Sequence, residues 1–150
     1  MSKKIGILVG SLRKDSFTRQ VAEATAKLFP KDVSVEFVEI AHLPFFNQDF
    51  ESPSASPESH TAFCKQIEGL DGFLFATPEY NRSYSPALKN ALDIASRPYG
   101  LSKWNGKPFA IVSVSPGAIG GFGANHHLRQ FMTNINMQPD KQPEASIKNV

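Results

Sequence analysis

Cysteine is nearly absent from this chain of 150 residues, in which Cys64 is the only one. A single thiol cannot form an intramolecular disulfide, so no disulfide framework supports the fold. Long apolar runs are also missing, and we expect neither a signal peptide nor a membrane-spanning segment. The sequence therefore predicts a cytoplasmic protein with no membrane partner.

A large excess of one sign of charge is missing as well. The chain carries 16 Lys and Arg residues against 14 Asp and Glu residues, which leaves a net charge of +2. That excess is too small to indicate a nucleic-acid partner. The length and the hydrophobic content of 41% predict one globular domain over residues 1–150 with a core of its own.

Spacing suited to metal ligands is missing too. His126 and His127 are neighbours in a predicted helix, where adjacent side chains point in different directions. His42 and His60 have no partner at a matching distance in the sequence. We therefore predict no metal site.

The chain does contain a regular alternation of strand and helix patterns. Apolar or alternating segments typical of strands occupy residues 4–10, 33–40, 72–77, 108–115 and 142–147. Helices are predicted from Asp15 or Ser16 to Pro30 and over residues 58–68, 86–96 and 124–134. This order predicts a doubly wound sheet of five parallel strands with helices on both faces.

Three further details of this prediction concern the first helix, one long loop and the end of the sheet. The first helix is expected to bury a stripe formed by Phe17, Val21, Ala24 and Leu28. Residues 41–57 form a long irregular segment of the kind that is usually functional or mobile. A sheet of this order normally has one more helix after its last strand. Without it, part of one face is expected to be uncovered, unless a partner subunit covers it or the sequence is a fragment.

Unusual loops follow the first, third and fourth strands, which end at the same edge of such a sheet. The first loop offers hydroxyl groups and Arg13 at the start of a helix, where an anion is favoured. Ordinary capping by Ser16, with Arg13 in solvent, explains the same residues equally well. A Cys-x5-Arg phosphatase is excluded because position 11 is serine, and the G-x-G-x-x-G dinucleotide pattern is missing.

The second loop places Glu79, Tyr80 and Asn81 together, directly after the third strand. A turn capped by Ser83 or Ser85, with Pro86 as the first helical residue, explains the serines and the proline but not these three residues. Their amide, phenol and carboxylate suit a flat ring system with polar edges. The third loop, residues 115–123, contains four glycines that let a ligand approach the backbone closely.

These loops resemble those of the NADPH-dependent FMN reductase family, which includes quinone, chromate and azo-dye reductases. The resemblance covers nearly the whole chain, in order. Its motifs are Gly10-Ser11-x-Arg13-x-x-Ser16, Thr77-Pro78-Glu79-Tyr80-Asn81-x-Ser83, Leu88-Lys89-Asn90-Ala91-x-Asp93, Gly117-x-x-Gly120-Gly121, Leu128-Arg129-Gln130 and Gln142-Pro143-Glu144.

The resemblance implies a flavodoxin-like fold that binds FMN and forms homodimers or homotetramers. It assigns the FMN phosphate to Ser11, Arg13, Ser16 and Thr18. It assigns the isoalloxazine ring and the ribityl chain to Pro78, Glu79, Tyr80, Asn81 and Ser83, and the other end of the ring to Ser115 and Gly117.

The implied activity is an FMN-dependent oxidoreductase. NADPH or NADH would reduce the flavin, and the flavin would reduce a small-molecule acceptor: a quinone, an azo compound, free flavin or a metal oxyanion. No catalytic acid or base is expected, since the flavin carries the chemistry. This chain departs from the family pattern at three places. Thr18 stands where relatives commonly have Asn, and Ser85-Pro86 replaces the more usual Pro-Gly. Relatives also continue beyond the position of Val150.

Two other functions remain open at this point. One is a flavodoxin-like electron carrier, although such carriers are usually strongly acidic and this chain is not. The other is a non-catalytic scaffold built on the flavin-binding fold, which would bind flavin poorly and serve only in assembly. Oxidation of NAD(P)H separates the enzyme from the carrier, and flavin binding separates both from the scaffold.

Overall fold

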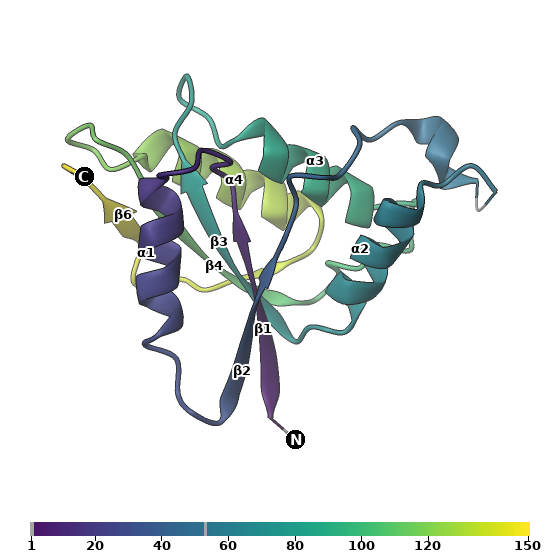
Figure 1. Ribbon diagram of the computed structural model, residues 1–150, viewed down its shortest axis with the longest axis horizontal. Coiled ribbons are helices and arrows are strands. Elements are labelled where there is room, and N and C mark those ends of the chain that lie inside the picture. The colour runs from purple at the N-terminus through teal and green to yellow at the C-terminus, as the bar shows by residue number, and fades with distance from the viewer. Residues whose placement is uncertain (1, 53) are drawn as a thin grey trace.

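A computed structural model describes residues 2–52 and 54–150 of the chain. Its centre is a parallel sheet built on four strands: β1 (Lys3–Val9), β2 (Val33–Val38), β3 (Gly72–Pro78) and β4 (Pro108–Val114). The strands lie in the order β2-β1-β3-β4-β5, and Figure 1 labels the first four of them. This is the flavodoxin-like order, and its switch point lies between β1 and β3. The predicted doubly wound parallel sheet is confirmed.

The fifth position of the sheet is divided between two short strands. β5 (Gln138–Pro139) pairs with the beginning of β4, and β6 (Ala145–Ile147) pairs with its end. The prediction of one strand over residues 142–147 is therefore wrong at its beginning and misses β5. Pro143 has no N–H to donate to a ladder and is exposed, so pairing with β4 resumes only at Ala145.

Helices cover the two faces of the sheet unequally. The helices α2 (Glu58–Glu68), α3 (Pro86–Ala95) and α4 (Phe122–Asn134) pack on one face, where their apolar side chains join those of the strands in the larger of two core clusters. On the other face, α1 (Phe17–Ala26) packs across β1, β3 and β4 and is the only helix there in the described chain (Figure 1).

The buried stripe of α1 differs from the predicted one. Thr18 and Ala22 are its buried residues, whereas Leu28 is 82% exposed and Phe17 is 44% exposed. The difference arises because the helix packs small residues close against the sheet and turns Phe17 toward the edge where the strands end. A helical repeat in the sequence gives the spacing of a stripe, but not which of two adjacent stripes is buried.

The helix starts settle two alternatives that the sequence left open. Ser16, and not Asp15, caps α1, since its Oγ accepts a hydrogen bond of 3.1 Å from Arg19 N. Ser85, and not Ser83, caps α3, with Pro86 as the first helical residue and Leu88 N bonded to Ser85 Oγ. Both caps fix the angle at which a site loop enters its helix.

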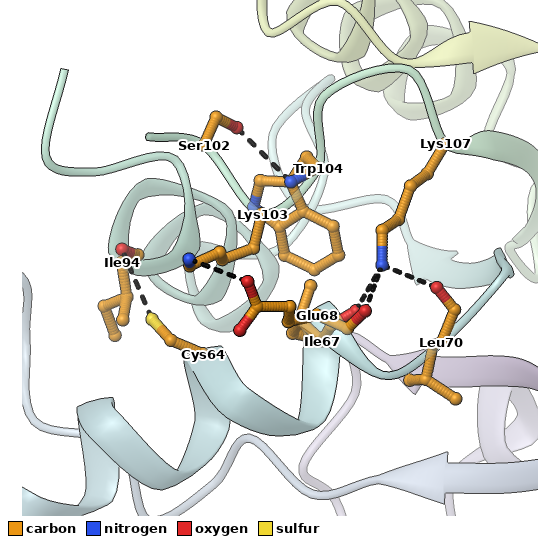
Figure 2. A network of polar contacts seen from close by, with 9 residues as sticks. All are labelled: Cys64, Ile67, Glu68, Leu70, Ile94, Ser102, Lys103, Trp104 and Lys107. Carbon is orange, nitrogen blue, oxygen red and sulfur yellow. Dashed lines mark hydrogen bonds and ion pairs between the residues drawn. The ribbon is translucent and has the colours of Figure 1, made fainter. Parts of the chain in front are cut away.

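Trp104 lies in the core rather than on the rim of a site. It is fully buried, its indole N–H donates to Leu92 O at 3.0 Å, and its ring packs edge to face against Phe63, Phe73 and Phe75. Nearby, the Lys107 ammonium lies against the C-terminal end of α2 (Figure 2). It donates to the carbonyl oxygens of Ile67, Glu68 and Leu70 at 2.5–2.9 Å, which places a positive charge at the end of the helix where the carbonyl groups point.

The beginning of the irregular segment, residues 43–46, is bonded to α3 and α2. Asn90 of α3 accepts from Phe46 N at 2.7 Å and donates to Pro44 O at 3.0 Å and to Leu43 O at 3.3 Å. The Nε2 of His60 lies 2.9 Å from the same Pro44 oxygen and must carry a proton, because a carbonyl oxygen only accepts. The part of this segment that the structure describes also contains the short 3₁₀ helix η1 (Gln48–Glu51), which an Arg97–Glu51 ion pair of 2.6 Å ties to the end of α3.

Among residues 2–52 and 54–150, no helix is both long enough and apolar enough to cross a membrane.

Candidate functional site

A cavity of about 230 Å³ lies where the loops after β1, β3 and β4 meet. It brings together eight of the eleven predicted site residues, which are Ser11, Arg13, Ser16, Thr18, Pro78, Glu79, Tyr80 and Ser115. Residues separated by about 100 positions in the sequence thus line one space. The predicted convergence of the three loops is therefore present in the structure.

The first loop forms the polar end of this cavity. Ser16 uses its oxygen to cap α1, so its hydroxyl hydrogen is still available to a ligand. The hydroxyls of Ser11 and Thr18 have no hydrogen-bond partner within the described part of the chain, nor do the backbone N–H groups of Phe17 and Thr18 in the first turn of α1. The Arg13 guanidinium lies 5.2 Å from the centre of the Phe17 ring. Capping by Ser16 and anion binding are therefore compatible.

In the second loop, Glu79 has a structural contact that the sequence did not indicate. Its Oε2 accepts a hydrogen bond of 2.9 Å from Ala124 N in the first turn of α4, and its side chain is only 11% exposed. The residue before α4, Gly121, has no side chain to cap the helix, so the Glu79 carboxylate does so instead. A Cβ on Gly123 would lie 3.0 Å from that carboxylate oxygen, which explains the glycine. Glu79 thereby connects the second and third loops.

The next residues form a tight turn. Tyr80 and Ser83 exchange two backbone hydrogen bonds of 2.9 and 3.0 Å, and Asn81 and Arg82 between them have φ values of 51° and 67°. This is the geometry of a type I′ turn, which suits Asn but strains Arg. The Ser83 hydroxyl lies 2.8 Å from His127 Nδ1. Asn81 and Ser83 therefore line a neighbouring cavity of about 470 Å³ and not the one where the loops meet.

The third loop contributes Ser115, whose Oγ accepts a 3.2 Å hydrogen bond from Gly117 N. Gly117 itself is exposed and lies outside the lining of the cavity. Gly120 lies so close to β6 that a Cβ would be 2.8 Å from a backbone atom of Ser146. At least one glycine of this loop therefore serves close packing of backbone on backbone, and not the approach of a ligand.

The lining includes four apolar residues that the sequence did not single out as site residues. They add apolar surface beside Pro78 and Tyr80 and are Phe17, Val114, Pro116 and Val150. Phe17 was assigned to the core by its helical spacing, although an exposed aromatic residue beside hydroxyl groups could have been read as a ligand contact. Val114 ends a buried strand and carries no such signal.

The donor set fits FMN. Hydroxyls, a guanidinium and free helix N–H groups from the first loop suit a phosphate, and the apolar surface of Phe17, Pro78 and Tyr80 suits a flat ring. FMN would supply hydride transfer at this position, while the residues of the three loops would hold and orient it. A larger cavity of about 650 Å³ lies between η1, α2 and the end of α3. It contains none of the eleven predicted residues, so it is not the convergence point of the loops.

Comparison with known proteins identifies the family. Residues 3–150 match the family model described as NADPH-dependent FMN reductase. The chain belongs to this family. The fold, the FMN cofactor and the NAD(P)H-dependent oxidoreductase class predicted from the sequence are thereby confirmed.

Individual members of the family are similar over nearly all of this chain. A quinone reductase of Pseudomonas putida is 52% identical over 143 residues, which are 95% of this chain and 76% of the relative. A 2-hydroxy-1,4-benzoquinone reductase of a Burkholderia species is 51% identical over 148 residues, covering 99% of this chain and 80% of that protein. The solved structure of FerB, an NAD(P)H:(acceptor) oxidoreductase of Paracoccus denitrificans, superposes with a TM-score of 0.90 at 39% identity. That match covers 97% of this chain and 79% of FerB.

Proposed function

We propose that this FMN-dependent oxidoreductase binds its flavin in the cavity of about 230 Å³ and passes electrons from NAD(P)H to quinones. The observation that carries the proposal is the convergence of three loops on one cavity, with hydroxyls and Arg13 at one end and Pro78, Tyr80 and Ser115 elsewhere on its wall. The names of the two relatives at 51% and 52% identity support a quinone as the acceptor.

The proposed roles follow from the positions of the residues. Ser11, Ser16 and Thr18 would donate hydroxyl hydrogens to the flavin phosphate, and Arg13 would swing from the Phe17 ring to neutralise it. Pro78 and Tyr80 would lie against the ring and the ribityl chain. Glu79 would act through Ala124 by holding the third loop in place, and not by touching the flavin. No side chain of the cavity is proposed as a catalytic acid or base.

Asn81, Ser83 and Gly117 have different proposed roles. Asn81 and Ser83 shape the tight turn beside Tyr80, and they would meet the flavin only where it extends toward the neighbouring cavity. Gly117 would contribute its backbone through the hydrogen bond that orients Ser115.

The remaining parts of the proposal concern the whole molecule. We infer that residues 1–150 act as a single flavin-binding domain, that the protein is cytoplasmic, and that it works as a homodimer or homotetramer. Exposed aromatic residues near the site and on the segment of residues 41–57 are available for such contacts: Tyr80 is 46% exposed and Phe45 is 79% exposed.

The first test is a fluorescence titration of the apoprotein with FMN, for the unaltered protein and for Arg13→Ala. Removing one guanidinium from a phosphate costs about 1.5–3 kcal/mol, so we expect Kd to rise about 10- to 100-fold. Lys31→Ala, which removes an exposed positive charge outside the cavity, serves as the control and should bind FMN normally. An Arg13→Ala protein with unchanged affinity would remove Arg13 from the phosphate site.

The second test adds NADPH to the FMN-loaded protein under anaerobic conditions, followed by a benzoquinone. We expect the flavin absorbance to bleach with NADPH and to return when the quinone is added. Bound FMN that NADPH and NADH both fail to bleach would favour an electron carrier. Failure to bind FMN at all would favour the scaffold.

A further inference from the structure

The cavity of about 650 Å³ between η1, α2 and the end of α3 shares no lining residue with the flavin cavity. Its volume falls within the range of about 300–1,000 Å³ that is typical of pockets for small organic ligands. Two aromatic rings, Phe46 and Phe50, line it, and Ile94, Pro98 and Leu101 add apolar surface. Rings in the wall of a pocket favour a ligand that is itself aromatic, because aromatic pairs pack edge to face or offset.

The charged groups around this cavity are mostly engaged with one another. Arg97 is paired with Glu51 at 2.6 Å, and Lys103 is paired with Glu68 at 3.1 Å; Figure 2 shows the second pair. Both carboxylates that line the cavity in the described chain therefore have a cation beside them. The remaining charge is that of Lys65, which is exposed. Such a wall offers nothing to an amine and favours a neutral or weakly acidic ligand.

His60 presents an unused hydrogen-bond acceptor to this cavity. The residue is only 4% exposed, and its Nε2 donates to Pro44 O at 2.9 Å. In the neutral ring the other nitrogen, Nδ1, has a lone pair and accepts. Among residues 2–52 and 54–150, Nδ1 has no hydrogen-bond partner, and it is not one of the unpaired atoms closed off from solvent, which are Asn125 Oδ1 and Arg129 Nε. Nδ1 is therefore open to the space that His60 lines.

The hydroxyl groups of Ser56 and Thr61 line the same cavity and lie 3.5 Å apart, at the limit of a hydrogen bond. Either can donate to an oxygen of a ligand. The oxygen of a phenol donates and accepts, so it can meet His60 Nδ1 and one of these hydroxyls together. A ring N–H group can only donate, and an aryl ether would leave Nδ1 without a partner.

We propose that this cavity is a second ligand site, which binds a small aromatic molecule through its phenolic hydroxyl group. The phenolic O–H is assigned to His60 Nδ1, and the ring is assigned to the space beside Phe46 and Phe50. The Phe50 ring already lies edge to face on His60, with 5.7 Å between ring centres, and so holds the imidazole in place. The site is separate from the flavin cavity and does not depend on the proposed function.

Cys64 provides a direct reporter of occupancy, because it lines the cavity and is the only cysteine in the chain. The FMN-loaded protein is treated with N-ethylmaleimide, with and without 2-naphthol, and the rate of alkylation is followed by mass spectrometry. Burial raises the pKa of the Cys64 thiol, so the buffer is mildly alkaline. We expect 2-naphthol to slow the alkylation in a saturable way. 2-Methoxynaphthalene has the same rings but no O–H, and it should bind about fivefold more weakly, the equivalent of one neutral hydrogen bond.

The variant His60→Gln tests the assigned contact. The side-chain N–H of glutamine can donate to Pro44 O in place of Nε2, but glutamine has no acceptor in the position of Nδ1. We expect 2-naphthol to bind this variant about fivefold more weakly, so that the two ligands protect Cys64 equally. His42→Gln changes an exposed histidine outside the cavity and should keep the difference between the ligands. If His60→Gln does not fold, the pair of ligands on the unaltered protein still tests the contact.

Four results would overturn the proposal. Saturating 2-naphthol that leaves the alkylation rate unchanged would show that the cavity does not bind the phenol. Equal protection by both ligands in the unaltered protein would remove His60 Nδ1 from the site. Quenching of flavin fluorescence by 2-naphthol without protection of Cys64 would place the phenol at the flavin instead.

The fourth result concerns the oligomer. Alkylation that is blocked without any ligand, and begins when the protein is diluted, would show that a second copy of the chain covers the cavity. If the protein binds no FMN, the proposed function fails, whereas the same assay on the unloaded protein still decides whether the phenol site exists.

Discussion

Replacing Asn90 with alanine should loosen the segment of residues 41–57 from the rest of the molecule. Asn90 is buried and makes three hydrogen bonds to this segment, accepting from Phe46 N at 2.7 Å and donating to Pro44 O and Leu43 O. It lies in the Leu88-Lys89-Asn90-Ala91-x-Asp93 motif. The motif therefore contains a residue whose contacts are all made with a distant part of the chain.

The magnitude follows from those contacts. A neutral hydrogen bond contributes about 0.5–1.5 kcal/mol, and the bond of 3.3 Å to Leu43 O is weaker than the other two. Pro44 O keeps its contact with His60 Nε2, so one acceptor is not left unpaired in the variant. We therefore expect Asn90→Ala to lower the free energy of unfolding by about 2–3 kcal/mol, which corresponds to a decrease of about 5–10 °C in Tm for a chain of this size.

Urea denaturation monitored by circular dichroism measures the global change, and limited proteolysis with cleavage-site mapping shows whether residues 41–57 open first. Lys89→Ala on the same helix is the matched control. It removes one i,i+4 ion pair with Asp93 and should change stability by less than about 0.5 kcal/mol. A loss of less than 0.5 kcal/mol in Asn90→Ala, with the segment still resistant to protease, would refute the reasoning.

Two further predictions concern Glu79 and Tyr84. Glu79→Ala should remove the cap of α4 and lower the free energy of unfolding, measured by urea denaturation, by about 0.5–2 kcal/mol. Glu79→Gln keeps an acceptor for Ala124 N and should recover most of that loss. Equal losses in both variants would argue against the cap. Burial, together with the charge of Asp93, raises the pKa of Tyr84 to about 12, so an ultraviolet absorbance titration should show one tyrosine ionising late, and Tyr84→Phe should abolish that component. Because the folded state favours the neutral phenol, stability should fall as the pH rises from about 10 to about 12, and a Tyr84→Phe protein with the same alkaline decline would contradict this assignment.

The architecture and the family could be read from the sequence because both depend on local patterns. Alternating buried strands and helices leave few topologies open, and the ends of β1, β3 and β4 must then lie at one edge of the sheet. The residues after those ends therefore identified most of the cavity, including Ser11, Arg13 and Tyr80. Hydrogen-bonding side chains next to strand ends are a signal that needs no knowledge of packing.

Only the tertiary structure decided what each of these side chains contacts. Glu79 lines the cavity where the three loops meet and also caps α4, a contact that the sequence does not indicate. Phe17, which helical spacing places in the core, lines the cavity as well. The division of the last strand into β5 and β6, and the clamp of Asn90 on residues 41–57, also depend on partners far away in the chain. Such partners are chosen by the fit of whole surfaces in three dimensions, whereas periodicity and capping residues report only on the nearest turn of the backbone.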